Sequence, residues 1–216
     1  MKVVSCLKGD ALIAENIAAD AINILEERDK VREEVLKTLR EIGRLARKVV
    51  MNIHSGDEDK AAKMLNKAKE KVLKVKEFKE SHPELYYTGS VLGTLAEYSE
   101  AFMLYNYIFK DKLANFKEVG VEPAAYLLGL SDLIGELRRY MLKLIDENNF
   151  EAAERTLKIM EEIYSSLMEI VLPEALVPGL RRKLDINRIT LENSRKDLLF
   201  HKQSYILLRE LKRLLK

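Results

Sequence analysis

Two pairs of acidic residues stand out in this sequence because of their spacing and their surroundings. Glu97 and Glu100 are three residues apart, and Asp132 and Glu136 are four residues apart. On helices, residues at these spacings share a face, so each pair would present two carboxylates side by side. No Lys, Arg or His lies between positions 85 and 109, so the first pair has no cation close to it along the chain.

The chemistry of such acids depends on what balances their charge. Two carboxylates about 5 Å apart repel by roughly 3 kcal/mol at an effective dielectric constant of about 20. Four converging carboxylates therefore need protons, cationic partners or a divalent metal. Oxygen ligands without histidine or thiolate favour Mg²⁺, with Mn²⁺ as the second choice, and such a metal activates water against a phosphate ester. The four acids are thus the candidate metal-binding and catalytic residues.

The other interpretation of the acids is structural. Glu136 could pair with Arg139 one turn away, and Glu97 could pair with a lysine of another helix. Spacing alone leaves both interpretations open. Gly93 and Gly135 lie beside the two pairs, and we expect them to allow a close approach of two helices. A short connector favours antiparallel packing of these helices, which would bring the four acids together.

The elements that must position these residues are long helices. The chain of 216 residues has 47% hydrophobic residues with only 9 Gly and 4 Pro, and apolar residues recur at three- and four-residue steps. We predict an all-α fold with a single domain of six to seven long helices over residues 20–216. Residues 1–19 are expected to form an N-terminal extension, frayed or in a short helix. Apolar stripes of this length favour a homo-oligomer.

Several residues mark the expected helix boundaries. Asp57 is a helix-capping residue, and Pro83 and Pro123 stand where prolines open a helix, in the first turn. The third helix should open at Pro83 and run without a break to Phe109. The six expected helices end near His54, Glu80, Phe109, Asp146, Leu172 and the C-terminus.

Composition limits the class of protein. The net charge is +2 and the sequence pI is about 8.4, so bulk charge alone does not indicate a nucleic-acid binder. Cys6 is the only cysteine, which excludes an internal disulfide and suits a reducing compartment. No apolar run has the length of a membrane span, and the N-terminus does not resemble a signal peptide. We expect a cytoplasmic protein without a membrane partner.

Two other helical metal-dependent classes compete. Ferritin-like proteins need Glu-x-x-His, but none of the histidines, at positions 54, 82 and 201, has an acid three residues before it. Helical nucleoside triphosphate pyrophosphatases also align Glu-x-x-Glu with a second acid pair around Mg²⁺. The four-residue step from Asp132 to Glu136 departs from their pattern, which leaves this class as a further alternative.

Three segments resemble the translin family, and most closely its catalytic branch, translin-associated factor X. They are "GTLAEYSEAF", "PAAYLLGLSDLIGELRR" and, more loosely, "LRRKLDINRITLENSRKDL". The resemblance begins near residue 20. It implies a metal-dependent endoribonuclease that prefers single-stranded RNA, with Glu97, Glu100, Asp132 and Glu136 in its active site. It further implies a hollow shell, an octamer in this family, that can include a second translin-family subunit. The non-catalytic branch, which binds single-stranded RNA or DNA, lacks these acids.

The expected contacts to nucleic acid depart from the family pattern. Translin carries basic residues after paired tyrosines, whereas "TGSV" follows Tyr86 and Tyr87 here. Lysines at three- and four-residue steps offer phosphate contacts instead, and so does an arginine pair beside Glu136. The alternative for the lysines is a solvated helix face, and the alternative for Arg139 is a simple salt bridge. The candidate nucleic-acid-binding residues are Lys63, Lys67, Lys71, Arg138 and Arg139.

Overall fold

A computed structural model describes the backbone of residues 4–215 and the side chains of residues 18–215. All regular structure in this part of the chain is helical, which confirms the predicted fold class. Six of the helices are long, within the predicted range. The elements are α1 (Val4–His54), α2 (Glu58–Ser81), α3 (Pro83–Tyr86), α4 (Gly89–Lys110), α5 (Phe116–Val119), α6 (Pro123–Asp146), α7 (Phe150–Met168), the 3-10 turn η1 (Glu174–Leu176) and α8 (Leu180–Leu214).

Local capping explains where several helices begin. The Asp57 side chain accepts a hydrogen bond from the backbone N–H of Lys60 and caps α2, as predicted. The expected single helix from Pro83 to Phe109 is wrong, because the chain breaks into α3 and α4. The Thr88 side chain accepts from the N–H of Val91 and starts α4 as a new helix. The end of the fifth expected helix also shifts, since α7 ends at Met168 rather than near Leu172.

The segment expected as a separate N-terminal extension is continuous with the first long helix. From Val4 onward it belongs to α1, which runs without a break to His54. The helix ends there because Gly56 adopts a left-handed conformation with φ of +79°, which an L side chain rarely adopts. Asp57 then starts α2 directly.

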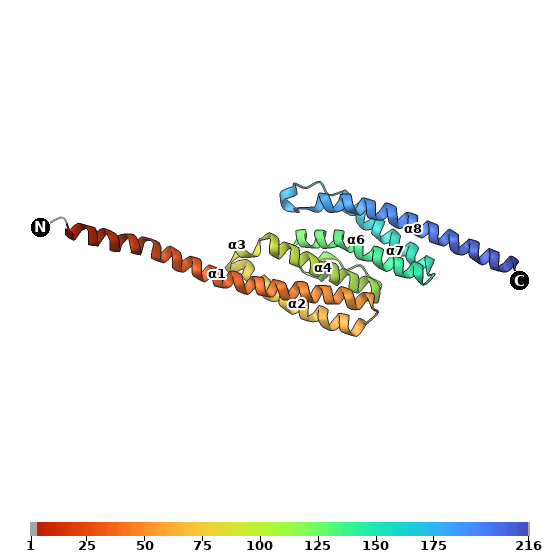
Figure 1. The fold of residues 1–216 in the computed structure, drawn as a ribbon, viewed down its shortest axis with the longest axis horizontal. Coiled ribbons are helices and arrows are strands. Elements are labelled where there is room, and N and C mark those ends of the chain that lie inside the picture. The colour runs from red at the N-terminus through yellow and green to blue at the C-terminus, as the bar shows by residue number, and fades with distance from the viewer. Residues whose placement is uncertain (1–3, 216) are drawn as a thin grey trace.

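The long helices form an elongated bundle with α4 and α6 at its centre (Figure 1). On one side of α4 lie α1 and α2, and on the other side of α6 lie α7 and α8. The core includes fully buried side chains from most of these elements. They are Ile42, Val49, Leu104, Leu133, Leu137 and Met160.

The two central helices run parallel, so the expected antiparallel packing is wrong. The Tyr86 hydroxyl donates to Glu122 before the two helices start, and the Tyr107 and Tyr140 rings lie 6.4 Å apart near their ends. Residues 111–122 carry the chain back along the bundle.

The close approach of α4 and α6 occurs at a glycine other than the two expected. A Cβ added to Gly129 would lie 2.6 Å from the Ser99 Cβ and 2.7 Å from the Ala96 carbonyl oxygen. Nothing lies within 4 Å of a Cβ added to Gly93 or Gly135. The prediction that these two glycines allow close packing is therefore wrong, and Gly129 takes that role.

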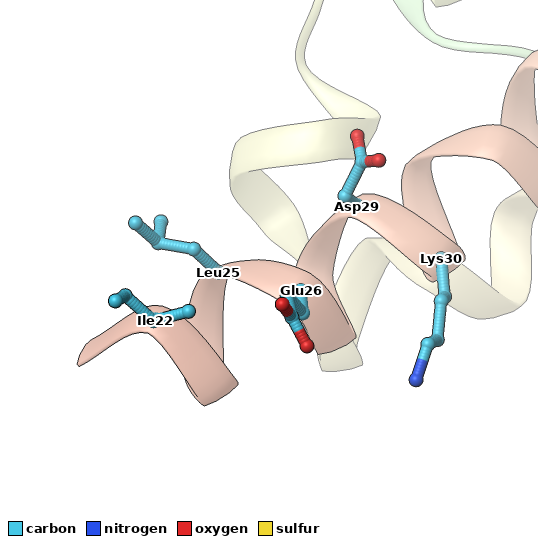
Figure 2. Close-up of a pocket in the computed structure, with 5 residues that line it drawn as sticks. All are labelled: Ile22, Leu25, Glu26, Asp29 and Lys30. Carbon is cyan, nitrogen blue, oxygen red and sulfur yellow. The ribbon is translucent and has the colours of Figure 1, made fainter. Parts of the chain in front are cut away.

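Both ends of the bundle carry apolar side chains outside the core. Ile22 and Leu25 of α1 are 52% and 61% exposed, and they line a shallow pocket together with Glu26, Asp29 and Lys30 of the same helix (Figure 2). The C-terminal part of α8 projects at the opposite end (Figure 1). Its exposed apolar residues include Phe200, Ile206, Leu207, Leu208 and Leu211. None of the helices within residues 4–215 combines the length and apolar character needed to cross a membrane.

Candidate functional site

The four acids predicted as a site approach one another beside the α4–α6 contact. Glu97 and Glu100 come from α4, and Asp132 and Glu136 come from α6. Because the helices run parallel and touch at Gly129, the second pair lies alongside the first. A pocket of about 430 Å³ between α1, α4 and α6 is lined by Glu97, Glu100 and Glu136. The helix packing, rather than a loop, therefore holds these carboxylates.

Glu100 is the one of the four acids whose pKa is strongly raised. Burial raises its pKa to about 8, and the nearby carboxylates of Asp132 and Glu136 act in the same direction. Glu100 makes no hydrogen bond or ion pair with any side chain in the described part of the chain. A pKa of about 8 favours the protonated form of Glu100 at neutral pH, and protonation is one of the three ways of relieving repulsion between clustered acids.

Glu97 is held by an arginine of α1. The Arg47 guanidinium donates to Glu97 Oε2 over 3.3 Å, and the Arg47 side chain is 69% exposed. Gly43 makes room for both groups, because a Cβ there would lie 3.1 Å from Glu97 Oε2 and 3.5 Å from an Arg47 nitrogen. The pair is solvated and contributes little to stability.

Glu136 is held by a histidine at the end of α1. His54 Nε2 lies 2.5 Å from Glu136 Oε2, and the His54 side chain is only 8% exposed. This hydrogen bond lowers the pKa of Glu136, so the carboxylate is ionised and Nε2 donates. Arg139 lies 3.9 Å from the same oxygen, which matches the expected pairing one turn along α6.

Asp132 is held by a lysine of α8. Lys183 Nζ lies 2.5 Å from Asp132 Oδ1, and both side chains are about one-third exposed, at 35% and 31%. Three of the four acids are therefore engaged through one oxygen each, by Arg47, His54 and Lys183. Hydrogen bonds from described residues leave the second oxygen of each of these acids unused.

The acids are suitable ligands for a divalent metal, but they are not arranged as a complete coordination site. All donors are hard carboxylate oxygens, and a cation would relieve the repulsion that raises the Glu100 pKa. No group of three or more His, Cys, Asp or Glu side chains in the described residues is placed so that it could hold a metal as it stands. Metal binding would require carboxylates to rotate and Glu100 to lose its proton.

The three basic residues that contact the acids were missed from the sequence. Arg47 and His54 precede Glu97 and Glu136 by 50 and 82 residues, and Lys183 follows Asp132 by 51. No short-range spacing could have indicated these pairs. They depend on α1 and α8 flanking the α4–α6 contact.

The basic residues proposed from the sequence are placed unequally. Arg138 donates to Asp197 over 2.7 Å and to Ser194 over 2.8 Å, so its guanidinium ties α6 to α8 rather than facing the acids. Lys71 pairs with Glu41 over 2.6 Å. The remaining candidates are exposed on the surface, and only one of them, Arg139, lines the acid pocket. They are Lys63, Lys67 and Arg139.

A second basic surface follows α1 into the pocket. We call Arg40, Arg44 and Arg47 the arginine ridge. All three are exposed on neighbouring turns, and Arg47 lines the pocket beside Glu97. Arg40 and Arg44 make no ion pair with a described residue. Three- and four-residue steps in the sequence could have indicated this ridge, as they did the lysines.

Known proteins resemble this chain over most of its length. A protein of Methanocaldococcus jannaschii, itself uncharacterized, is 38% identical over 194 residues, which cover 89% of this chain and 86% of the relative. The solved complex of AfC3PO with duplex RNA has a TM-score of 0.81 at 38% identity, covering 87% of this chain and 97% of that one. AfC3PO alone has the same score and identity, covering 87% of this chain and 98% of that one.

A more distant structure shares the fold. Apo-NeC3PO is 24% identical with a TM-score of 0.75, covering 84% of this chain and 96% of that one. The sequence profile of the translin family matches residues 30–194, which include the four acids and the arginine ridge. The resemblance noted from "GTLAEYSEAF" and "PAAYLLGLSDLIGELRR" is thereby confirmed at the level of the family. This chain belongs to the translin family.

Proposed function

We propose that this protein is a Mg²⁺-dependent endoribonuclease of the translin-associated factor X type, with Mn²⁺ as an alternative metal. One observation carries the proposal. Glu100, with a pKa of about 8, lies at a solvent-open pocket beside three further carboxylates and two arginines, Arg47 and Arg139. Perturbed acids in such a pocket are typical of catalytic sites. The solved complex of AfC3PO with duplex RNA, a relative at 38% identity, supports RNA as the substrate of this protein.

The residues of the pocket divide the task. Glu97 and Glu136, which line the pocket, and Asp132, which lies outside its lining, are the oxygen donors, and each is already oriented by one protein contact. A divalent cation bound there supplies charge neutralisation and Lewis-acid activation of water. Glu100 holds a proton near neutral pH and releases it when a cation lowers its pKa. The guanidinium groups of Arg47 and Arg139 can meet the negative charge of a phosphodiester.

A non-catalytic RNA-binding shell is the second candidate. It is favoured by the protein contacts that already engage three of the four acids and by the lack of a preformed metal group among the described residues. Buried or half-buried acids with cationic partners can be purely structural. The arginine ridge would serve this function equally well.

The assembly is expected to be a homo-oligomeric shell, an octamer, with room for a second family subunit. Its support is the apolar surface at the two ends of the bundle, on α1 around Ile22 and Leu25 and on α8 from Phe200 onward. When a second copy covers these exposed apolar groups, their removal from water stabilises the assembly. Light scattering at micromolar concentration measures this, and a monomeric mass would contradict it.

RNA cleavage tests the enzymatic proposal directly. Labelled single-stranded and duplex RNA are incubated with the protein in Mg²⁺, in Mn²⁺ and in EDTA, beside the variant Glu100→Gln and the double variant Glu97→Gln/Glu100→Gln. We expect cleavage of single-stranded RNA that EDTA abolishes. Because the acids act as one unit, the double variant should be no worse than the single one.

Two results would support one of the alternative functions instead. RNA that is bound but not cleaved in any metal supports the non-catalytic shell. Hydrolysis of nucleoside triphosphates without RNA cleavage supports the pyrophosphatase alternative, so a panel of triphosphates is assayed in parallel.

A further inference from the structure

His54 connects the end of α1 to α6 at two points. Its ring contacts Glu136 Oε2 over 2.5 Å, and its backbone carbonyl accepts from Lys143 Nζ over 3.3 Å. Glu136 and Lys143 are seven residues apart, so the two contacts lie about two turns apart on one side of α6. The turn after His54 is set by Gly56 and by the Asp57 cap of α2. The turn itself therefore fixes the position from which the ring approaches α6.

The two carboxylate oxygens of Glu136 lie in different environments. Oε2 faces a histidine ring that is 8% exposed, whereas the Glu136 side chain is 24% exposed and lines the pocket. No hydrogen bond from a described residue uses Oε1. A carboxylate held at one oxygen loses rotational freedom at the other, which lowers the cost of ordering it around a ligand.

We infer that His54 is a positioning residue that orients the Glu136 carboxylate, so that its free oxygen is presented to a divalent cation in the pocket. His54 itself is not placed as a ligand, because it does not line the pocket and its Nε2 already donates to Glu136. The inference rests on the proposed function, since it concerns the same site. It adds a residue of α1 to a set of acids that comes only from α4 and α6.

Two substitutions at His54 separate positioning from packing. His54→Gln keeps an amide N–H near the position of Nε2, whereas the shorter side chain of His54→Asn cannot reach Glu136. Mn²⁺ binding without RNA is measured by electron paramagnetic resonance of the free ion. We expect His54→Gln to bind within a few-fold of the unmodified protein and His54→Asn to bind roughly 10- to 100-fold more weakly, as for other residues that orient metal ligands.

A matched control and a double variant complete the test. Lys143→Met removes the contact to the His54 carbonyl but leaves the ring in place, so its Mn²⁺ affinity should be unchanged. In a Glu136→Gln background, His54→Asn should cause no further loss, because it acts through Glu136. Circular dichroism confirms that each variant is folded.

The outcomes that overturn the inference differ from those that overturn the proposed function. If the unmodified protein binds Mn²⁺ and His54→Asn binds it equally well, the positioning role is wrong. The same holds if His54→Asn weakens binding by the same factor with and without Glu136, or if Lys143→Met weakens it as much. If the unmodified protein takes up no Mn²⁺ and cleaves no RNA, the proposed function falls and this inference falls with it.

Discussion

Gly129 of α6 lies so close to Ser99 of α4 that a Cβ on the glycine would be 2.6 Å from the Ser99 Cβ. It would also be 3.0 Å from the backbone nitrogen of Glu100. Real Cβ atoms do not approach other heavy atoms at the shorter of these distances, so a side chain at this position requires the helices to separate. The spacing of the acid pocket therefore depends on the absence of a side chain at Gly129.

Gly129→Ala should destabilise the protein and widen the pocket. Overpacking of a tight contact costs about 1–3 kcal/mol, and here the neighbouring atoms belong to the backbone and to Cβ, which cannot rotate away. We expect a lower midpoint in urea unfolding and weaker Mn²⁺ binding. Gly93→Ala and Gly135→Ala are the controls, because both positions face open space. Each should instead gain about 0.5–1 kcal/mol of helix stability, and a loss of stability in either would contradict this assignment.

Local features of the fold could be predicted from the sequence, because their causes lie within a few residues. The Asp57 cap and the helix-opening prolines Pro83 and Pro123 are of this kind, and each is found where expected. The break at Thr88 was missed because a capping threonine inside an apolar stretch resembles an ordinary helical residue. Its effect depends on the side chain turning back to the N–H of Val91.

The packing direction of the central helices could not be predicted in the same way. A connector such as 111–122 can either turn or run back along the bundle, and the choice is made by contacts such as Tyr86 with Glu122. The four acids were identified correctly as neighbours on two helices, but for a wrong geometric reason. Their partners Arg47, His54 and Lys183 depend on where α1 and α8 pack, and that is long-range information.

The stability of the metal-free protein should fall as the pH rises from about 5 to about 8. The folded-state pKa of Glu100 is about 8 against an ordinary value of 4.5, so the folded state keeps a proton in this window that the unfolded state releases. The free energy of unfolding then decreases by at most about 1.4 kcal/mol per pH unit from this group. Below the ordinary pKa of 4.5, Glu100 is protonated in both the folded and the unfolded state, and its full contribution to the free energy of unfolding is present.

Glu100→Gln isolates this effect. The amide does not titrate, so the difference between the two unfolding free energies in EDTA should grow in favour of the variant from pH 5 to pH 8. Contributions from groups that do not interact with Glu100 cancel in this difference. Urea unfolding curves at several pH values across this range measure it. Parallel stability profiles for the two proteins would show that Glu100 titrates normally.

The arginine ridge, rather than the lysines of α2, should carry most of the RNA affinity. Arg40 and Arg44 are exposed, unpaired among the described residues and continuous with the pocket through Arg47. In EDTA, Arg40→Gln/Arg44→Gln should weaken binding of every single-stranded RNA alike. If both arginines neutralise phosphates, the slope of log affinity against log salt should fall by roughly 1.4, which is about 0.7 for each phosphate that is no longer neutralised.

Lys63→Gln/Lys67→Gln is the matched control, because it removes the same charge from an exposed helix face. Fluorescence anisotropy over a range of salt concentrations measures both variants. Equal losses of affinity would indicate a general effect of net charge. A loss confined to the lysine variant would assign the RNA-binding surface to α2, as predicted from the lysine spacing.

Glu97, Glu100 and Glu136 should respond unequally to replacement by the matching amide, because their partners differ. Glu97→Gln frees only the exposed Arg47, so its unfolding free energy in EDTA should change by about 0–1 kcal/mol. Glu136→Gln weakens the hydrogen bond from the buried His54 and should cost about 1–2 kcal/mol. Glu100→Gln should be stabilising at pH 8, since it removes the repelled carboxylate.

A metal-dependent shift decides whether these acids form one binding unit. A cation that binds only the folded state at about 100 times its dissociation constant adds about 2.7 kcal/mol to stability. Mg²⁺ or Mn²⁺ should therefore raise the melting temperature of the unmodified protein, and each single amide variant should lose most of that rise, Asp132→Asn included. Lys158→Gln, on the exposed face of α7, is the control that should keep the full shift. A metal shift that is equal in all variants would place the cation elsewhere, and the catalytic interpretation of the four acids would then be wrong.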